Sequence, residues 1–343
     1  MKWNFFFLSD LKFFSIFTFL FFILFFTACS SQAPKNELFI YSTMDEPLIQ
    51  KLSKAYLEET GNKLQFVRLS TGEAAARIDA EKKNPQASLW LGGIALNHQQ
   101  LKERGLSEAY QPLVWSEIPN EYKDPQSFWT GLYIGILAFA SNKEQLKKLE
   151  SEAPRSWAEL TDKKFKNQIQ LAHPGTSGTS YNVMAALIAK DGEKSAFDFF
   201  QKLHANVSQY TRSGSAPAKN AAIGETAVAV GYAHDIARLI HEDKAPLELS
   251  FPKEGTGYEI ASISLIKGGK QQELAKDFYN WMYSKTASQI LADYYVYPLI
   301  QNGVQMKEKS INPAAFPLIH FDIDWAGKNR ERLVNQWNEK INS

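Results

Sequence analysis

The chain has 343 residues, of which 44% are hydrophobic, 22% charged and 13% aromatic, a composition typical of a folded globular protein. Its length predicts roughly two domains. A formal net charge of only +1 excludes the basic excess that drives sequence-independent nucleic-acid binding, so no nucleic-acid partner is expected.

The N-terminus has the pattern of an export signal. Lys2 and Lys12 precede an apolar run over residues 13–28, which is too short for a typical transmembrane helix and ends in small residues. Directly after it comes Cys29, the only cysteine of the chain. Small residues before a cysteine resemble a lipobox, which implies cleavage before Cys29 and lipid on its sulfur and amine. Residues 1–28 are therefore predicted to be a lipoprotein signal peptide, and several acyl chains such as palmitate would anchor the protein stably.

Two residues depart from this pattern. Asp10 lies in the charged region, and Phe26 occupies a motif position where Leu is commoner. The alternative is an uncleaved signal anchor with an incidental cysteine. Residues 29–36 are predicted to form a polar tether. We expect an exported protein anchored to the cell membrane by lipid, on the periplasmic face or at the cell surface.

The rest of the chain alternates strand-like and helix-like segments. Short apolar runs predict strands, and amphipathic segments with helical spacing predict helices. Strands are expected at 38–41, 63–69, 88–91, 132–141, 169–172, 227–231 and 258–266. Helices are expected at 46–59, from 70 to about 83 and after Ser156. Further helices are expected after Ser180 up to about residue 190, after Asp235, and over most of the chain from about 271. This alternation implies an α/β fold with a parallel sheet covered by helices.

Four loops are rich in small and hydroxyl-bearing residues. Ligands of open parallel sheets bind beyond the carboxyl ends of the strands, where helix N-termini favour anions. Each loop alone could simply supply caps and turns, but four at equivalent places favour a site for phosphate or carboxylate that needs no Lys or Arg. The Thr176 loop is the strongest candidate. The loops are Ser42-Thr43, Ser70-Thr71-Gly72, Thr176-Ser177-Gly178-Thr179 and Ser213-Gly214-Ser215.

Three further polar residues could orient the rest of a ligand. His234 and Asp235 directly follow an apolar strand, and Glu259 lies at the start of another. An imidazole and two carboxylates are good partners for hydroxyl groups. The alternatives are a helix cap for His234 and a solvent-facing strand position for Glu259. Trp129 and Tyr133 could either stack on a ligand or pack in the core.

Signatures of catalysis are weak. The six histidines lack the spacing of a zinc-protease helix, and there is no Walker loop. Residues 175–178 differ from a nucleophile elbow in spacing. We therefore expect no enzyme, no cofactor and no bound metal. A phosphate-ester hydrolase is the enzymatic alternative, for which the sequence offers no evident nucleophile.

The residues from 38 to 93 resemble bacterial ABC-transporter solute-binding proteins of the ferric-binding-protein-like group, and further matches span nearly the whole mature chain. The resemblance implies a two-lobed type II periplasmic-binding-protein fold, with crossover strands at 132–141 and 258–266 and the ligand in the cleft. The lobes would comprise 37–135 with 259–300, and 136–258 with 301–343. The matching stretches are Tyr41-Ser42-Thr43, residues 66–73, residues 84–93, Ser215-Ala216-Pro217, residues 255–259 and residues 322–326.

One departure concerns the ligand. Ferric binders of this group place two adjacent tyrosines where this chain has His234-Asp235. That pair, with Gly257-Tyr258-Glu259, is similar to the hexose-phosphate-binding branch. The resemblance implies that His234, Asp235 and Glu259 hold the sugar. The residues implied on the phosphate side are Ser42, Thr43, Thr71, Thr176, Ser177, Gly178 and Thr179, and Gly72 and Ser215 complete the expected ligand-binding set.

The resemblance also implies the partners. A monomer is expected to bind a sugar phosphate or related phosphorylated compound and deliver it to an ABC permease in the membrane. Two other functions stay open: import of ferric iron, and ligand sensing by a lipoprotein that reports to a two-component membrane kinase.

Overall fold

The computed structural model describes residue 1 and residues 36–341 of the chain. The predicted signal peptide after Met1, the Cys29 lipidation site and the tether up to residue 35 lie outside the described residues. No helix within the described part is long and apolar enough to cross a membrane.

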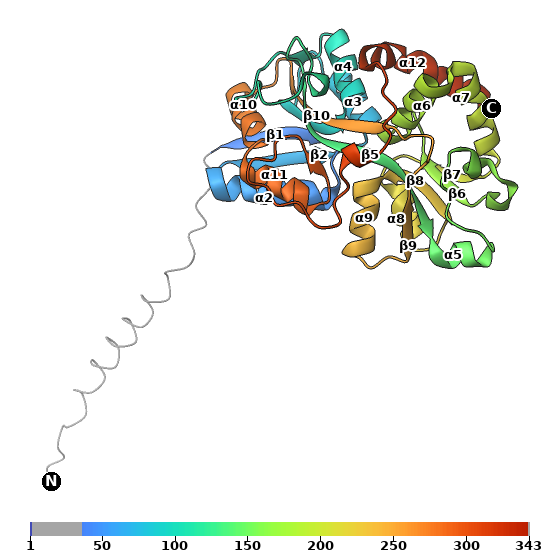
Figure 1. Ribbon diagram of the computed structural model, residues 1–343. Helices are drawn as coiled ribbons and strands as arrows, with labels where there is room; N and C mark the ends of the chain where they lie inside the picture. The colour runs from blue at the N-terminus through green and yellow to red at the C-terminus, as the bar shows by residue number, and fades with distance from the viewer. Residues whose placement is uncertain (2–35, 342–343) are drawn as a thin grey trace. The chain divides into compact units, whose positions relative to one another are not determined.

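A single long strand connects two β-sheets. β5 (Thr130–Asn142) is buried along its whole length. Its first half, up to Ile136, pairs antiparallel with β10 (Tyr258–Ile266), whereas Leu137–Asn142 pairs with β8 (Val228–Tyr232) and β9 (Leu247–Ser250). The strands follow the order β2-β1-β3-β10-β5-β8-β6-β7. Figure 1 shows β5 running from the first sheet into the second.

We call the elements around the first sheet the first lobe. Its strands are β1 (Glu37–Ser42), β2 (Lys63–Arg68), β3 (Leu89–Ile94), β4 (Ser107–Glu108), β10 and β11 (Tyr297–Pro298). Its helices are α2 (Glu46–Thr60), α3 (Thr71–Ala80), α4 (Ala95–Glu103), α10 (Gln272–Trp281) and α11 (Lys285–Asp293), with the 3₁₀ turn η1 (Asn120–Tyr122).

The second lobe surrounds the second sheet. Its strands are the end of β5, β6 (Ile169–Ala172), β7 (Val207–Thr211), β8 and β9. Its helices are α5 (Lys143–Lys148), α6 (Gly178–Asp191), α7 (Glu193–His204), α8 (Ala216–Ala222) and α9 (Ala233–His241). The 3₁₀ turns η2 (Ala158–Thr161), η3 (Lys163–Phe165) and η4 (Pro313–Ala315) and the helix α12 (Ile323–Lys340) complete the described chain.

Local sequence explains the helices that lead to the cleft. Asp45 precedes α2, a proline lies in its first turn, and Gly61 ends it at a left-handed φ of 72°. Only glycine adopts that conformation without strain. The predicted apolar stripe of α2 is buried. A capping box between Ser70 and Glu73 starts α3.

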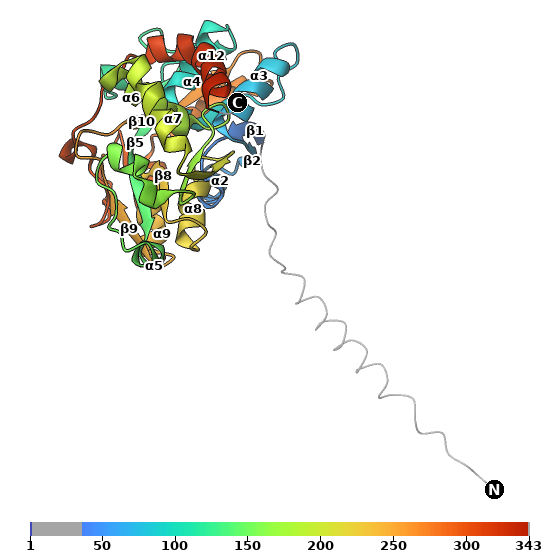
Figure 2. The same cartoon turned by 90° about the vertical axis from the view of Figure 1, so that its right-hand side faces the viewer.

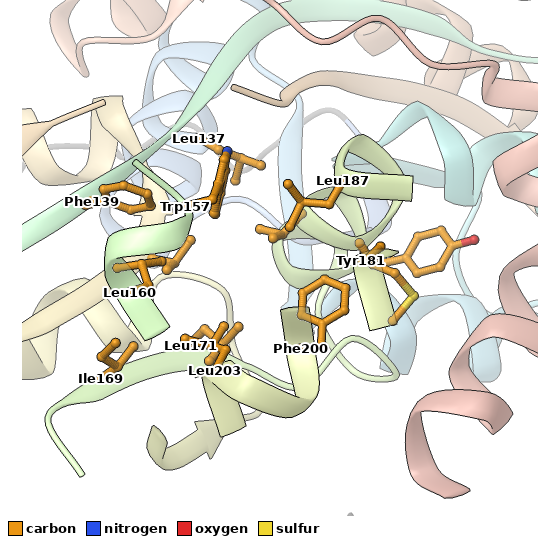
Figure 3. Close-up of a cluster of buried hydrophobic side chains, with 14 of the residues drawn as sticks. Leu137, Phe139, Trp157, Leu160, Ile169, Leu171, Tyr181, Leu187, Phe200 and Leu203 are labelled. Atoms are coloured by element: carbon orange, nitrogen blue, oxygen red, sulfur yellow. The ribbon is translucent and has the colours of Figure 1, made fainter. Parts of the chain in front are cut away.

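Each lobe has its own hydrophobic core. In the first lobe, α2 and α10 cover the sheet with Leu52, Tyr56 and Phe278, all fully buried. In the second lobe, aromatic side chains of α7 and Trp157, directly before the η2 turn, pack against β5 and β6 (Figure 3). Trp157, for example, meets Phe139 edge to face with ring centroids 5.1 Å apart. The burial of such large rings makes each lobe rigid enough to position its loops.

The helix α12 packs on both lobes. It contacts α4 of the first lobe and α7 of the second, and Figure 2 shows these helices on one side of the molecule. At Gly327 an added Cβ would lie 3.2 Å from the carbonyl oxygen of Leu96, so α12 and α4 are closely packed. The predicted division into 37–135 with 259–300 and 136–258 with 301–343 stays a prediction, since the C-terminal segment touches both lobes.

Three expectations about the elements need correction. The sheets are mixed and not purely parallel, because β5 leaves the first lobe and β10 returns to it, so these neighbours run in opposite directions. The helix expected after Ser156 is only the short η2 turn. Within the described residues 294–322 there is one short strand and one 3₁₀ turn in place of continuous helix. Three prolines in that stretch, Pro298, Pro313 and Pro317, explain the interruption.

Candidate functional site

A cavity lies between the lobes, at the carboxyl ends of the parallel strands. It has an empty volume of about 640 Å³, counting the space at its mouth. Loops from both sheets line it, which is the placement expected for an open α/β sheet. The lining residues are Thr43, Met44, Asp45, Leu48, Arg68, Ser70, Thr71, Gly93, Ile94, Tyr133, Ser177, Thr179, Ser213, Gly214, Ser215, Tyr232, His234, Asp235, Glu259 and Tyr294.

One end of the cavity receives the N-termini of two helices, α3 and α6. Their first turns are in contact across the cleft, because a Cβ on Gly178 would lie only 3.0 Å from the Thr71 hydroxyl oxygen. The hydroxyls of Thr71, Ser177 and Thr179 line the cavity here. The Ser177 hydroxyl is buried and has no hydrogen-bond partner, so it is available to a ligand. Helix dipoles and hydroxyls together suit an anionic group.

Arg68 adds a full positive charge to this end. It is the last residue of β2, and its guanidinium donates to the Ser213 hydroxyl (3.1 Å) and the Met44 carbonyl (3.4 Å). No carboxylate ion pair is recorded for Arg68 among the described residues. Sequence reasoning missed this residue by expecting an anion site without Lys or Arg. The signal was present, since Arg68 is the second-last residue of the strand predicted at 63–69, just before the Ser70 loop.

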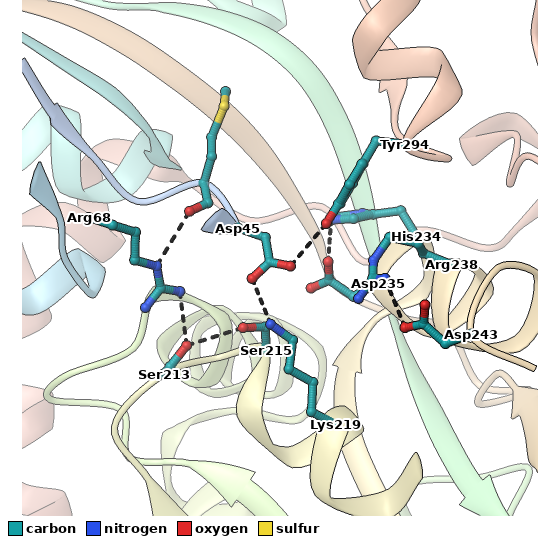
Figure 4. A network of polar contacts seen from close by, with 11 residues as sticks. Asp45, Arg68, Ser213, Ser215, Lys219, His234, Asp235, Arg238, Asp243 and Tyr294 are labelled. Carbon is teal, nitrogen blue, oxygen red and sulfur yellow. Dashed lines mark hydrogen bonds and ion pairs between the residues drawn. The ribbon is translucent and has the colours of Figure 1, made fainter. Parts of the chain in front are cut away.

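The other end of the cavity carries carboxyl and imidazole groups. Figure 4 shows Arg68 and Ser213 on one side and His234, Asp235 and Tyr294 on the opposite side. Asp45 lies between these two groups. His234 Nε2 lies 3.7 Å from Asp235 Oδ1 and 4.0 Å from Glu259 Oε1. These distances are too long for direct hydrogen bonds. The Nδ1 atom of His234 is buried without a partner, which leaves hydrogen-bonding capacity for a ligand.

Burial sets the protonation states at this end. It raises the pKa of Glu259 well above its usual range, and the nearby charge of Asp235 raises it further. Burial also raises the pKa of Asp235 and lowers the pKa of His234. The electrostatic attraction between the two side chains acts in the opposite direction on each pKa but is the smaller effect. Glu259 is therefore a neutral acid and His234 a neutral imidazole. Both can donate and accept hydrogen bonds, as sugar hydroxyls do.

Gly135 on β5 makes room for these groups. A Cβ at this position would lie 2.6 Å from Glu259 Oε1 and 2.8 Å from His234 Cε1. Both distances are shorter than van der Waals contact, so any larger residue here would displace Glu259 or His234. The rings of Tyr232 and Tyr133 enclose His234, stacked at 5.6 Å and edge-on at 5.7 Å between centroids.

Several polar contacts join the lobes across the cavity. Lys219 Nζ lies 2.7 Å from Asp45 Oδ1, and Arg212 forms an ion pair with Glu73. The Arg68–Ser213 hydrogen bond also spans the cleft. The structure therefore represents a closed arrangement of the lobes, held by polar contacts between them.

The backbone adds one more cross-cleft bond. The amide of Gly72 donates to the carbonyl of Thr176 at 2.9 Å. An added Cβ on Gly72 would lie 2.5 Å from the carbonyl oxygen of Gly175. The two loops can come this close only because glycine stands at position 72.

The structure brings eight of the twelve expected ligand-binding residues to the cavity. These are Thr43, Thr71, Ser177, Thr179, Ser215, His234, Asp235 and Glu259. The other four lie beside its lining and support the loops. Ser42 accepts from the amide of Met44, and the Thr176 hydroxyl donates to the carbonyls of His173 and Arg212. Gly72 and Gly178 allow the close approach of the two loops.

Of the two aromatic candidates, one lines the cavity and one does not. Tyr133 lines it, whereas Trp129 is buried in the core and donates its indole hydrogen to Gln99. Sequence reasoning also missed Asp45, Tyr232 and Tyr294 as lining residues. Tyr294 lies in the C-terminal half and reaches the cavity only through the tertiary fold, where its hydroxyl donates to Asp45 at 3.0 Å.

The described residues contain no group of three or more His, Cys, Asp or Glu side chains arranged to hold a metal ion. The cavity thus combines an anion-binding end with an end suited to hydroxyl groups. Two lobes, a shared crossover strand and a polar cavity between them define the class of type II periplasmic binding proteins.

Comparison with known proteins agrees with this class. Residues 97–323 match the family model described as bacterial extracellular solute-binding protein. The chain is 36% identical over 316 residues to an uncharacterized protein of Haemophilus influenzae, covering 90% of this chain and 91% of that protein. This chain therefore belongs to the family of bacterial extracellular solute-binding proteins, which serve ABC importers.

Two solved structures are similar. The periplasmic binding protein AfuA from Actinobacillus pleuropneumoniae, with exogenous fructose-6-phosphate bound, has a TM-score of 0.86 and 38% identity, covering 90% of this chain and 99% of AfuA. The ferric binding protein from Campylobacter jejuni has a TM-score of 0.75 and 23% identity, covering 88% and 98% of the chains, and shows the shared fold alone. These relatives are transport proteins and not enzymes, as the sequence predicted.

Proposed function

We propose that the chain binds a phosphorylated sugar, such as a hexose phosphate, in the cavity between its lobes and delivers it to an ABC permease. The observation that carries this proposal is the division of one cavity into two ends. Arg68, the hydroxyls and two helix N-termini favour a phosphate at one end. Neutral His234 and Glu259, with Asp235, favour sugar hydroxyls at the other.

The likeness to AfuA supports the same ligand class, since that protein was solved with fructose-6-phosphate. Under this proposal, Thr71, Ser177 and Thr179 contact the phosphate, with Thr43 and Ser215 beside them. Ser42, Gly72, Thr176 and Gly178 act by shaping the loops. We further propose that lipid on Cys29 keeps the protein at the membrane, close to its permease.

Ligand-dependent stabilisation tests the proposal. A ligand bound only by the folded state adds about 2.7 kcal/mol to the free energy of unfolding at a hundredfold excess over Kd. Purified protein would be screened by thermal shift, and then by calorimetry, with sugar phosphates, free sugars, inorganic phosphate, phosphonates and ferric citrate. We expect sugar phosphates to raise the melting temperature most. Stabilisation by ferric citrate but not by sugar phosphates would support the iron-import alternative.

The anchor has a separate test. Cys29→Ala is expected to abolish labelling by radioactive palmitate and to release the protein from the membrane fraction. Retention of the variant in membranes would instead favour an uncleaved signal anchor.

A gene deletion separates import from sensing. Impaired growth on the sugar phosphate after loss of the protein would favour import, and loss of a transcriptional response alone would favour sensing.

A further inference from the structure

Asn182 lies in the protein interior, between the two ends of the cavity. We call the part of the cavity that holds His234, Asp235 and Glu259 its hydroxyl-binding end. Asn182 is fully buried on α6, one turn after Thr179, which lines the anion-binding end. Asn182 itself is outside the cavity lining, so it acts on a ligand only through the residues that it holds.

The side-chain amide of Asn182 holds two parts of the hydroxyl-binding end. Its Nδ2 donates to the carbonyl of Tyr258 at 2.7 Å and to the hydroxyl of Tyr232 at 3.3 Å. Tyr258 directly precedes Glu259 on β10, and Tyr232 is the last residue of β8. The ring of Tyr232 stacks on His234 with centroids 5.6 Å apart. Asn182 therefore fixes the backbone that carries Glu259 and the ring that supports His234.

The hydroxyl of Tyr232 connects the two ends of the cavity. Burial raises the pKa of Tyr232 well above its usual range, and hydrogen bonding with Asn182 and Thr179 opposes that rise. Hydrogen bonding with Tyr232 likewise opposes the larger effect of burial on the pKa of Glu259. One hydroxyl group thus lies between Thr179 at the anion-binding end and Glu259 at the hydroxyl-binding end.

Close packing between α6 and β10 makes this link rigid. A Cβ on Gly257 would lie 2.8 Å from Ala186 Cβ and 3.1 Å from Asn182 Oδ1. Two successive turns of α6 therefore press on the backbone directly before Tyr258. Asn182 and Glu259 also line one small cavity together. Because close-packed interiors transmit displacements, the start of α6 and the start of β10 keep a fixed spacing.

We propose, building on the function above, that Asn182 is a positioning residue that sets the spacing between the two ends and so selects phosphorylated sugars by their length. A sugar held at its phosphate by the start of α6 must place its remote hydroxyls at His234 and Glu259. A shorter sugar leaves one of these buried groups without a partner, which disfavours its binding. Without the two bonds from Asn182, the hydroxyl-binding end shifts relative to α6 and the discrimination by length weakens.

Three ligands measure this spacing. Glucose 6-phosphate and ribose 5-phosphate carry the same phosphate and differ by one hydroxyl-bearing carbon, whereas inorganic phosphate occupies the anion-binding end alone. Calorimetry on the native protein is expected to give a Kd for ribose 5-phosphate at least about tenfold higher than for glucose 6-phosphate. In Asn182→Leu, which keeps a similar shape but donates no hydrogen bond, this ratio should fall at least about threefold. The Kd for inorganic phosphate should stay unchanged.

Asn206→Leu is the matched control. Asn206 is also buried, lies outside the cavity lining, and donates from Nδ2 to the carbonyls of Leu160 and Asp162 at 2.9 and 2.7 Å. We expect this substitution to lower the melting temperature without altering the ratio. Asn182→Ser removes the same bonds as Asn182→Leu with a smaller side chain, so the ratio is measurable even if leucine prevents folding. Melting without ligand reports whether each variant folds.

The outcomes distinguish this inference from the proposed function. Failure of every sugar phosphate to bind overturns both. If glucose 6-phosphate binds but native protein does not distinguish it from ribose 5-phosphate, or if the ratio is unchanged in the Asn182 variants, Asn182 does not set the spacing while the proposed function stands. An equal fall of the ratio in Asn206→Leu, or loss of inorganic phosphate binding in the Asn182 variants, also overturns the inference, since a general loss of structure would then be the cause.

Discussion

Glu259 shows how the fold assigns a protonation state to a single residue. It lies on β10, the strand that returns from the second lobe, and burial beside Asp235 raises its pKa well above the usual range. A neutral carboxyl group can donate a hydrogen bond, which an ionised one cannot. The residue is thereby suited to a ligand hydroxyl, and its pKa makes stability depend on pH.

The sign of that dependence follows from proton binding. A raised pKa means that the folded state holds its proton at a pH where the unfolded chain has lost it. Stability therefore falls as pH rises above the unfolded value of about 4.5, by up to about 1.4 kcal/mol per pH unit until the folded pKa is reached. Glu259→Gln removes this loss. Unfolding at pH 4 to 8 without ligand should show the variant gaining stability relative to the native protein as pH rises. A constant difference would contradict the raised pKa.

Gly135 provides a second test at the residue scale. In Gly135→Ala the new Cβ would press on Glu259 Oε1 and His234 Cε1. We expect a loss of about 1–3 kcal/mol of stability from overpacking and at least a tenfold loss of ligand affinity. Gly231→Ala on β8 is the matched control, because its nearest neighbours lie 3.9 Å away. If the two substitutions lowered stability and ligand affinity equally in calorimetry, the effect would belong to any substitution in a central strand and not to the contacts of Gly135.

At the scale of an element, α12 is a helix that packs on both lobes. Its N-cap is Asp322, whose carboxylate accepts from the amide of Trp325 at 3.0 Å. Asp322→Ala should cost about 1 kcal/mol of stability because the cap bond is lost. Asp324→Ala removes an equal charge from the same turn without removing a cap bond, so it should cost less. Thermal unfolding of the two variants measures both losses of stability. Equal losses would show that the lost charge, and not the lost cap bond, is the cause.

The second element that matters is the loop between β6 and α6. Arg330 of α12, almost fully buried, donates to the carbonyls of Pro174 and Gly175 and lies over the ring of Tyr181. These contacts fix the loop that presents Ser177 to the cavity. A C-terminal residue thus helps to position a site in the middle of the chain, a link that only the tertiary structure creates.

At the scale of the whole molecule, the closed arrangement depends on contacts between lobes. Lys219→Met removes the ion pair with Asp45. Because such partly exposed pairs contribute up to about 1 kcal/mol, the ratio of closed to open molecules without ligand should fall by as much as about fivefold. Small-angle scattering should show a larger radius of gyration for the variant, reversed by saturating ligand. Lys194→Met is the control, since Lys194 pairs with Asp198 within α7. Identical scattering of both variants would show that the contact does not hold the lobes.

Much of the molecule was readable from the sequence. Strand and helix segments such as residues 46–59 and 169–172 were recognised because apolar spacing and caps are local properties. Residues at the carboxyl ends of strands, His234 and Asp235 among them, were found because a parallel sheet gathers such ends at one edge. Eight of the expected residues line the cavity for this reason.

The tertiary structure decided the rest. Tyr294 and Asp45 come together from positions far apart in the chain, and no local pattern marks such a meeting. Ser42 and Thr176 have the chemistry expected of ligand contacts, yet their hydroxyls bond to the protein itself. Whether a polar group faces the cavity or the backbone depends on packing between elements. The sequence by itself determined the class and the polar loops, whereas burial between two lobes decided which groups face the cavity and in which protonation state.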